Sequence, residues 1–206
     1  MDPKAMFKLS YGLFVLTARE GEKDNGCITN TAIQVTSEPN RISIAVNKAN
    51  YTHGMVLRTG KFNVSILSQE ASFDTFKHVG FQSGRDVDKF ADFTACKRAE
   101  NGIYIITEGT NAYISAEVEQ TVDLGTHTLF IAKVTDLDVL SKVSSATYEY
   151  YQNNIKPKPA APAASAGKTV WRCTVCGYIY DGDPIPADFI CPLCKHPASD
   201  FEKVTQ

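Results

Sequence analysis

Two pairs of cysteines stand close together near the C-terminal end of this 206-residue chain, and they limit how that end can fold. Cys173 and Cys176 form one C-x2-C pair, and Cys191 and Cys194 form the other. Segment 170–206 is short, and chains below about 40 residues rarely fold without a metal, a disulfide or a partner. Four thiolates at this spacing can bind one ion tetrahedrally, so the sequence predicts a single-metal site. The spacing alone does not choose between iron and a zinc ribbon.

A run of small residues separates this segment from the rest of the chain. Positions 157–166 read PKPAAPAASA and contain no side chain able to build a core. In an extended polyproline form such a run spans about 30 Å. We therefore predict two folded units, residues 1–152 and 169–206, joined by a Pro/Ala-rich linker at 153–168.

The residues around the four cysteines favour iron. Trp171, the sequence CTVCGY at 173–178, Tyr180, DFICPLCK at 188–195 and Phe201 resemble the rubredoxin family. The insert between the two cysteine pairs is short, as in rubredoxin modules that are fused to other redox proteins. The resemblance implies a small metal-knuckle domain in which the four cysteines hold one iron that passes single electrons.

The first 150 residues alternate in the manner of β-strands. Stretches rich in Val, Ile, Thr, Tyr and Phe predict strands at 10–20, 27–39, 41–47, 61–67, 101–109, 111–122 and 127–140. The sequence EKDNG at 22–26 is expected to form a turn. Short helices are expected from Asn50 or Thr52 to Gly60 and from Ser72 to Val79. The predicted fold is mainly β, an antiparallel barrel with a few helices, and the absence of GxGxxG argues against a Rossmann domain.

Charge and hydropathy exclude several classes of partner. The formal net charge of −2 argues against nucleic-acid binding, which normally needs a basic face. The longest apolar runs, such as 13–16 and 129–132, are far shorter than a membrane span. The N-terminus lacks the apolar region of a secretory signal, so we predict a cytoplasmic protein with no membrane contact.

Four motifs in the first unit resemble one family. NGCITNTAIQVTSEPNRISIAVNKANYT at 25–52, GKFNVSIL at 60–67, SGRDVDKF at 83–90 and THTLFIAKV at 126–134 resemble the flavin reductase family with its FMN-binding split barrel. Joined to the tail, they resemble the high molecular weight rubredoxin family. That resemblance implies a homodimer in which FMN takes hydride from NADH or NADPH. The iron then passes electrons to a flavodiiron protein that reduces oxygen or nitric oxide.

The same resemblance implies a set of site residues. The expected cofactor-binding residues are Asn25, Cys27, Thr29, Asn30, Thr31, Asn47, Lys48, Asn50, Thr52 and Lys89. Residues 29–31 are expected at the polar edge of the flavin ring, and 47–52 at its phosphate, with Lys89 and more weakly Arg85 as further phosphate contacts. His127 is expected near the nicotinamide, although Thr126 replaces an acidic residue of the family pattern. By pattern alone these residues could equally be a solvated strand, a simple helix cap and a surface loop.

Two other functions remain open at this point. The chain could be an electron carrier that has no NAD(P)H site of its own. Alternatively, it could be a flavin reductase whose tail is a structural zinc ribbon.

Overall fold

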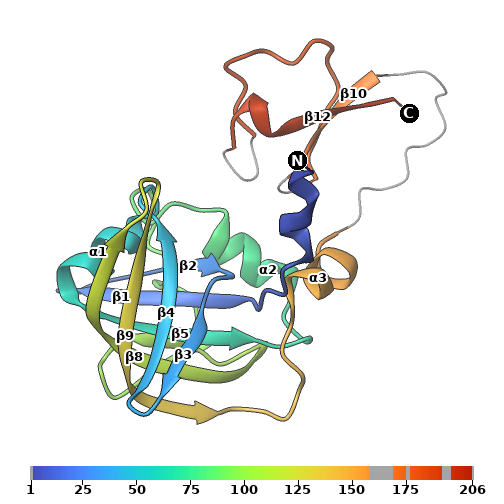
Figure 1. Cartoon of the computed structure of the whole chain (residues 1–206). Coiled ribbons are helices and arrows are strands. Elements are labelled where there is room, and N and C mark those ends of the chain that lie inside the picture. The colour runs from blue at the N-terminus through green and yellow to red at the C-terminus, as the bar shows by residue number, and fades with distance from the viewer. Residues whose placement is uncertain (1, 158–168, 175–176, 192–195, 206) are drawn as a thin grey trace. The chain divides into compact units, whose positions relative to one another are not determined.

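The computed structural model describes residues 2–157, 169–174, 177–191 and 196–205 (Figure 1). The chain divides into two compact units, residues 1–155 and 156–206. Of the predicted linker, residues 153–155 belong to a short π-helical turn of the first unit, and 158–168 lie outside the described residues.

The first unit is a rolled antiparallel sheet. Its seven described strands lie in the spatial order β2 (Lys23–Thr29), β1 (Phe14–Glu20), β5 (Lys61–Leu67), β8 (Thr110–Asp123), β9 (His127–Val139), β4 (Asn40–Asn47) and β3 (Ile33–Ser37). The two edge strands are consecutive in sequence and are joined by residues 30–32 alone. Such a link reaches about 15 Å, whereas a flat sheet of this size is about 29 Å wide. The sheet therefore curls until its edges nearly meet, which gives the barrel in Figure 1 and confirms the predicted class.

The apolar core lies in two layers that share strand β1. Phe14 and Leu16 point into the barrel, where they pack with Phe62 and Phe130. Val15, between them in the sequence, points the other way and packs under the helices that cover the sheet. Because neighbouring strand residues face opposite sides, a strand between two packed layers has few polar positions. This explains why the first five residues of β1 are all buried, with Thr17 the one polar residue among them.

Both expected helices are present. Helix α1 (Tyr51–Thr59) begins after Asn50 and ends at Gly60, which has the left-handed φ of 68° typical of a helix end. Helix α2 (Phe73–Thr75) is capped by the Ser72 hydroxyl, which accepts a bond from the Asp74 amide. The remaining helical turns are Pro3–Lys8, Phe76–Gly80, α3 (Tyr148–Tyr150), Tyr151–Ile155 and Ala198–Asp200.

One turn prediction and three strand predictions were wrong in their limits, and the strand expected at 10–20 begins only at Phe14. The turn expected at 22–26 lies instead at Gly21, whose φ of 59° allows a tight reversal, so that β2 already begins at Lys23. The strand expected at 27–39 is interrupted at residues 30–32, because the chain crosses there from one edge of the sheet to the other. The strand expected at 101–109 is reduced to β7 (Tyr104–Ile106), which pairs with β6 (Cys96–Arg98).

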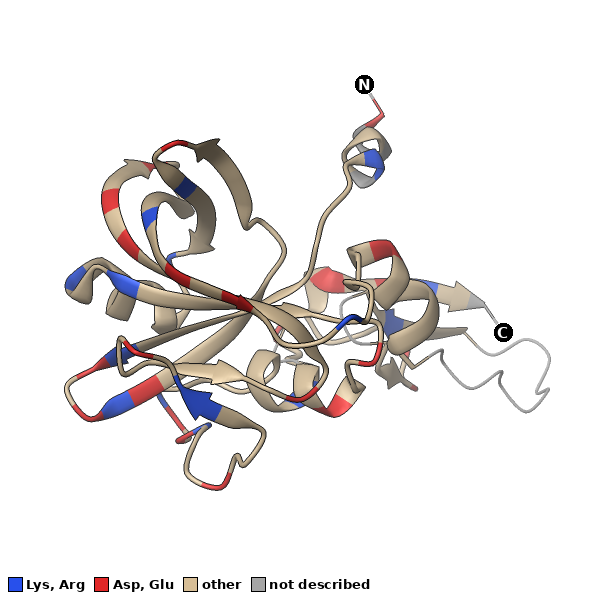
Figure 2. Cartoon of the chain, turned by 90° about the horizontal axis from the view of Figure 1, so that it is seen from below, with Lys and Arg blue, Asp and Glu red and all other residues tan. Residues whose placement is uncertain are grey.

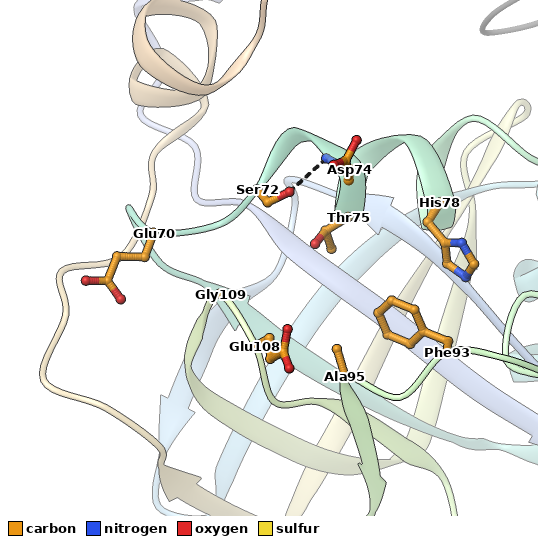
Figure 3. Close-up of a pocket in the computed structure, with 9 residues that line it drawn as sticks. All are labelled: Glu70, Ser72, Asp74, Thr75, His78, Phe93, Ala95, Glu108 and Gly109. Carbon is orange, nitrogen blue, oxygen red and sulfur yellow. Dashed lines mark hydrogen bonds between the residues drawn. The ribbon is translucent and has the colours of Figure 1, made fainter.

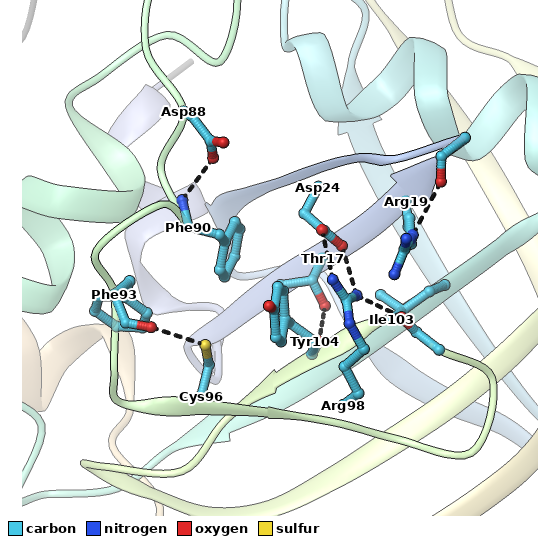
Figure 4. Close-up of polar contacts among 12 residues, drawn as sticks. Thr17, Arg19, Asp24, Asp88, Phe90, Phe93, Cys96, Arg98, Ile103 and Tyr104 are labelled. Carbon is cyan, nitrogen blue, oxygen red and sulfur yellow. Dashed lines mark hydrogen bonds and ion pairs between the residues drawn. The ribbon is translucent and has the colours of Figure 1, made fainter.

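A polar anchor holds the β6–β7 hairpin against the start of β2 (Figure 4). The Arg98 guanidinium donates to both carboxylate oxygens of Asp24, at 3.0 and 2.9 Å, and lies 3.9 Å from the centre of the Tyr104 ring. The Thr17 hydroxyl donates to the Tyr104 carbonyl at 2.6 Å. Two parallel bonds between guanidinium and carboxylate fix orientation as well as distance. This anchor therefore fixes β2 at Asp24, the residue next to the candidate site residue Asn25.

Surface charges of both signs are interspersed over the barrel strands (Figure 2). Some pair across neighbouring strands, as Lys61 does with Glu117 at 3.0 Å, with both side chains about half exposed. Exposed pairs of this kind contribute little to stability. No helix in the described part of the chain is long and apolar enough to cross a membrane.

The second unit is a small three-stranded antiparallel sheet in the order β11 (Ile179–Tyr180), β10 (Thr169–Cys173), β12 (Phe201–Thr205). Its ring cluster centres on Phe189, whose ring centroid lies 4.6 Å from that of Tyr180 and 5.5 Å from that of Phe201. The Trp171 indole donates to the Asp183 carboxylate at 3.1 Å. Tyr178, Tyr180 and Phe201, all named from the sequence, thus pack around the Phe189 ring.

Candidate functional site

A buried polar cluster joins β2 to the first turn of α1 and to the segment that ends at Lys89. Asn25 is 2% exposed, and its amide nitrogen donates to the Thr52 hydroxyl at 2.9 Å. The Lys89 ammonium donates to the backbone carbonyls of Gly26 at 2.8 Å and Val79 at 2.6 Å. Four predicted cofactor residues, Asn25, Cys27, Thr52 and Lys89, are therefore brought together by tertiary contacts.

Burial changes the protonation of two members of this cluster. Lys89 is 4% exposed, and burial lowers its pKa to about 8, against a smaller opposing effect of Cys27. Burial raises the pKa of the Cys27 thiol, against smaller opposing effects of Thr52 and Lys89. At neutral pH the cluster thus holds a charged lysine beside a neutral thiol, so Cys27 is not poised as a nucleophile.

One acceptor of the cluster has no donor. The Asn25 Oδ1 atom is buried and, among the described residues, has no hydrogen-bond partner. It lies against the buried backbone of Gly84, where a Cβ atom would stand 2.2 Å from it. A buried acceptor without a donor carries a desolvation cost of about 1–3 kcal/mol. A bound group with an N–H or O–H beside Asn25 would remove that cost.

The threonines predicted at the ring edge form a second group, at the gap between the sheet edges. The Thr29 and Thr31 hydroxyls are 3.1 Å apart, and Thr31 donates to the Ala45 carbonyl of β4 at 2.8 Å. Asn30 lies half-buried in the bend between them. These bonds hold residues 30–32, which link the two edge strands, against the C-terminal end of β4.

The first turn of α1 has no side-chain cap. Asn50 is the residue before the helix, but its side chain accepts no bond from the first-turn amides. Such amides and the helix dipole together favour a bound anion. Asn47 uses its side chain on the Ala49 amide at 2.9 Å, and Lys48 is paired with Asp123 at 2.7 Å. The Lys48 ion pair lowers the pKa of Asp123 and already neutralises the lysine selected by the sequence pattern.

His127 begins β9 and lies opposite Asn47 in the strand register, half-buried. Its Nδ1 atom is 2.9 Å from the Thr126 hydroxyl, so Thr126 orients the ring in place of the acidic residue of the family pattern. This places His127 at the same end of the barrel as the α1 turn. Its role toward a nicotinamide stays a prediction.

Sequence reasoning missed His53, which the structure buries beneath this end. The His53 Nε2 atom and the Thr128 hydroxyl share a hydrogen bond of 2.8 Å that ties α1 to the start of β9. Burial lowers the pKa of His53, reinforced by Lys48 and opposed by Asp123. No local pattern marks this histidine, because its partner is 75 residues away.

The lowered pKa of His53 predicts a pH-dependent stability. Below pH 6.5, the ordinary pKa of histidine, the imidazole of His53 takes up a proton more readily in the unfolded chain than in the folded one. The free energy of unfolding should therefore fall as the pH drops from 7.5 to 5.5. His53→Gln should flatten the difference between the urea midpoints at these two pH values. Thr128→Val should lower both midpoints but keep the difference, because the buried histidine remains. An equally steep dependence in His53→Gln would contradict the assignment.

A cavity of about 460 Å³ lies elsewhere on the first unit (Figure 3). Its lining includes the carboxylates Glu70, Asp74 and Glu108, and the stacked rings of His78 and Phe93. None of the predicted cofactor residues lines it. Three carboxylates disfavour a phosphate group, so this cavity is a poor candidate for the phosphate end of a cofactor.

The two cysteine turns of the second unit, or knuckles, begin at Cys173 and Cys191 and share one backbone hydrogen-bond pattern. The amide of Cys173 donates to the carbonyl of Tyr178, and the amide of Cys191 donates to that of His196, both at 2.8 Å. In each case the carbonyl lies five residues after the first cysteine. Cys173 is 1% exposed and Cys191 is 0% exposed. Cys176 and Cys194 lie outside the described residues.

Each of the two units matches a known protein family. Residues 6–158 match the model of the flavin reductase like domain. The chain belongs to the flavin reductase-like family. Residues 171–202 match the rubrerythrin, rubredoxin-like domain, so both resemblances found in the sequence are confirmed.

Two relatives show how far the similarity extends. The chain is 37% identical to a high molecular weight rubredoxin of Moorella thermoacetica, over 99% of this chain and 100% of that protein. It is 36% identical to a ferric-chelate reductase (NAD(P)H) of Archaeoglobus fulgidus, over 73% of this chain and 89% of that protein. The first similarity covers both units in the same order.

Solved structures support the fold. An FMN-binding protein from Thermus thermophilus superposes with a TM-score of 0.61 at 20% identity, covering 90% of this chain and 89% of that one. Together the comparisons confirm a flavin reductase-like barrel with a rubredoxin-like domain, and with it the predicted class of flavin-dependent oxidoreductase.

Proposed function

We propose that the chain is an NAD(P)H-dependent oxidoreductase that passes electrons through FMN to a rubredoxin-type iron and on to a protein acceptor. The main support for this function is that one chain combines a flavin reductase-like barrel with a unit whose two cysteine turns have the same backbone hydrogen bond. When bound, FMN would accept the two electrons of a hydride together and release them singly, as an iron centre requires. The two relatives, a high molecular weight rubredoxin and a ferric-chelate reductase (NAD(P)H), support a redox role with NAD(P)H as donor.

The residues at the α1 turn fit an FMN molecule. The uncapped amides of α1 suit a phosphate, and the Asn25 Oδ1 atom offers an acceptor to a hydroxyl or ring N–H. The Thr29–Thr31 pair lies along the gap between the sheet edges, where the polar edge of a flat ring can be met by hydroxyls. His127 would border the nicotinamide at the same end. Hydride transfer then depends on stacking and distance rather than on a general acid.

The second unit fits iron through its donor set. Two of its four thiols, Cys173 and Cys191, are buried in knuckles whose amides are held by backbone bonds. All-sulfur tetrahedral sites select iron or zinc, and the rubredoxin-like family match supports iron. Exclusion of water around the thiolates stabilises such a centre and tunes its potential.

The acceptor, the location and the assembly belong to the proposal. A flavodiiron protein that reduces oxygen or nitric oxide is the proposed acceptor, and the cytoplasm is the proposed location. A homodimer is supported by edge strand β3, where Ile33 is 64% exposed and Val35 is 47% exposed. An exposed apolar edge strand offers unpaired backbone groups and apolar side chains to a second chain. Light scattering on the purified full-length protein should give twice the mass of the chain.

One spectroscopic experiment tests the function. Purified full-length protein should show both flavin and rubredoxin-type iron absorbance, and metal analysis should find one iron per chain. Under anaerobic conditions, NADH or NADPH should bleach the flavin first and the iron afterwards. Absence of bleaching would favour a carrier without a coenzyme site. Stoichiometric zinc in a protein without the iron spectrum would favour a flavin reductase with a structural tail.

A further inference from the structure

The cavity of about 460 Å³ on the first unit has no part in the proposed function (Figure 3). Its volume lies within the range of about 300–1,000 Å³ that is common for small-molecule pockets. Among the described residues, its lining includes neither a predicted cofactor residue nor any lysine or arginine. The cavity is therefore a candidate site for a further ligand, and its lining indicates which kind.

Backbone contacts and hydrogen bonds hold the walls of this cavity in place. Gly109 has a φ of 66° and lies so close to Ala71 that an added Cβ atom would stand 2.8 Å from the Ala71 Cα atom. The His78 Nε2 atom donates to the Lys89 carbonyl at 2.6 Å, and the imidazole stacks on the Phe93 ring with centroids 4.7 Å apart. A ligand that enters a site whose walls are already fixed loses less free energy to ordering than one that must arrange them.

The cavity carries an excess of negative charge. Glu70, Asp74 and Glu108 line it, and Asp74 is paired with the Lys77 ammonium at 2.5 Å. The carboxylates of Glu70 and Glu108 make no ion pair or hydrogen bond with any residue that the structure describes. Two negative charges are thus left without a counter-ion. A cleft lined by charge of one sign concentrates the electric field, so this one attracts cations.

The rest of the lining favours an organic cation over a metal ion. The Phe93 ring and the Ala95 methyl group give one side an apolar surface, and Thr75 and Glu108 point into the space beside them (Figure 3). In the described ranges, no group of three or more His, Cys, Asp or Glu side chains could hold a metal ion. An ammonium group, in contrast, can donate to carboxylates and a hydroxyl while the carbon body attached to it packs on a ring.

We propose that this cavity binds a small organic amine. The ammonium group of the ligand contacts Glu108 and Glu70, and its apolar or aromatic body packs against Phe93 and Ala95. Phosphates and carboxylates are repelled by the same charge, so the site selects cations from the small molecules that fit it. The proposal is independent of the proposed function, because the lining shares no residue with the predicted cofactor site.

Three ligands that differ mainly in charge test the cavity on the full-length protein as purified. Benzylamine is a cation at pH 7, benzyl alcohol is neutral and benzoate is an anion, and all three carry the same ring. Ligand-observed NMR titration measures each dissociation constant. Benzylamine should bind at least about ten-fold more tightly than benzyl alcohol, because two carboxylates attract it, and benzoate should not bind.

Substitutions in the lining locate the binding. Glu70→Gln and Glu108→Gln should each weaken benzylamine binding about three-fold, and the double variant about ten-fold, as expected for partly exposed charges. Ala95→Leu fills the cavity without changing its charge, so it should abolish binding. Glu100→Gln, on an exposed turn outside the lining, is the matched control and should bind benzylamine as the wild type does.

Several results would overturn the proposal. These are wild-type protein that does not bind benzylamine or binds benzyl alcohol equally well, and Ala95→Leu protein that binds benzylamine as tightly as the wild type. The last result would mean that surface charge, rather than the cavity, attracts the amine. An equal loss in Glu100→Gln and Glu108→Gln would have the same meaning. Because Glu70 and Glu108 are exposed, their substitution leaves the core intact, and these variants decide the question independently of Ala95→Leu.

Discussion

Cys191→Ser should remove iron from the protein and unfold its second unit, while the barrel stays folded. Cys191 is fully buried, and its amide closes the second knuckle through the carbonyl of His196. A unit this small gains much of its folding free energy from the metal, so losing one of four ligands should lower iron content at least about ten-fold after a chelator wash. Metal analysis, visible absorbance and limited proteolysis of segment 169–206 measure the loss.

The same variant separates the two electron-transfer steps. NADH or NADPH should still bleach the flavin, because the barrel has its own core, but electrons should no longer reach a rubredoxin-dependent acceptor. Cys96→Ser is the control, since Cys96 lies outside the knuckles and its thiol donates to the Phe93 carbonyl at 3.0 Å. It should keep its iron. Full iron content in Cys191→Ser would contradict the four-thiolate assignment.

Gly84→Ala should weaken FMN binding at least about ten-fold. The added Cβ atom would stand 2.2 Å from Asn25 Oδ1 and 2.5 Å from its Cγ atom, in a buried position. Asn25 cannot move away without losing its bond to Thr52, so the segment that carries Arg85 should shift outward instead. Overpacking of this kind costs about 1–3 kcal/mol. Fluorescence titration with FMN and a urea denaturation curve measure the two effects.

A double variant shows whether the clash with Asn25 causes the weaker FMN binding of Gly84→Ala. Asn25→Ala should weaken FMN binding by itself, because it removes an acceptor from the site. In Asn25→Ala/Gly84→Ala the clash is absent, so the second substitution should add almost nothing to the first. Strictly additive losses would mean that Gly84 acts through something other than Asn25.

The metal centre was predictable from the sequence because its ligands are local. Cys173 and Cys176 share one short turn, and Cys191 and Cys194 share another, so spacing alone specifies each half of the site. Helix α1 was predictable for the same reason, since Asn50 and Gly60 mark its two ends. Alternating apolar residues also identified most strands. The limits of β2 and β3 were not predictable, because the break at residues 30–32 depends on which sheet edge each strand joins.

The sequence by itself determined that a metal-stabilised tail follows a β-rich unit, because turns, knuckles and strand periodicity depend on neighbours along the chain. Only the tertiary structure decided which polar residues of the barrel act together. It paired Lys48 with Asp123, buried Lys89 on two carbonyls and left Lys23 and Arg85 on the Tyr51 ring. Charge neutralisation and burial depend on groups far apart in sequence, and rolling the sheet brings those groups together.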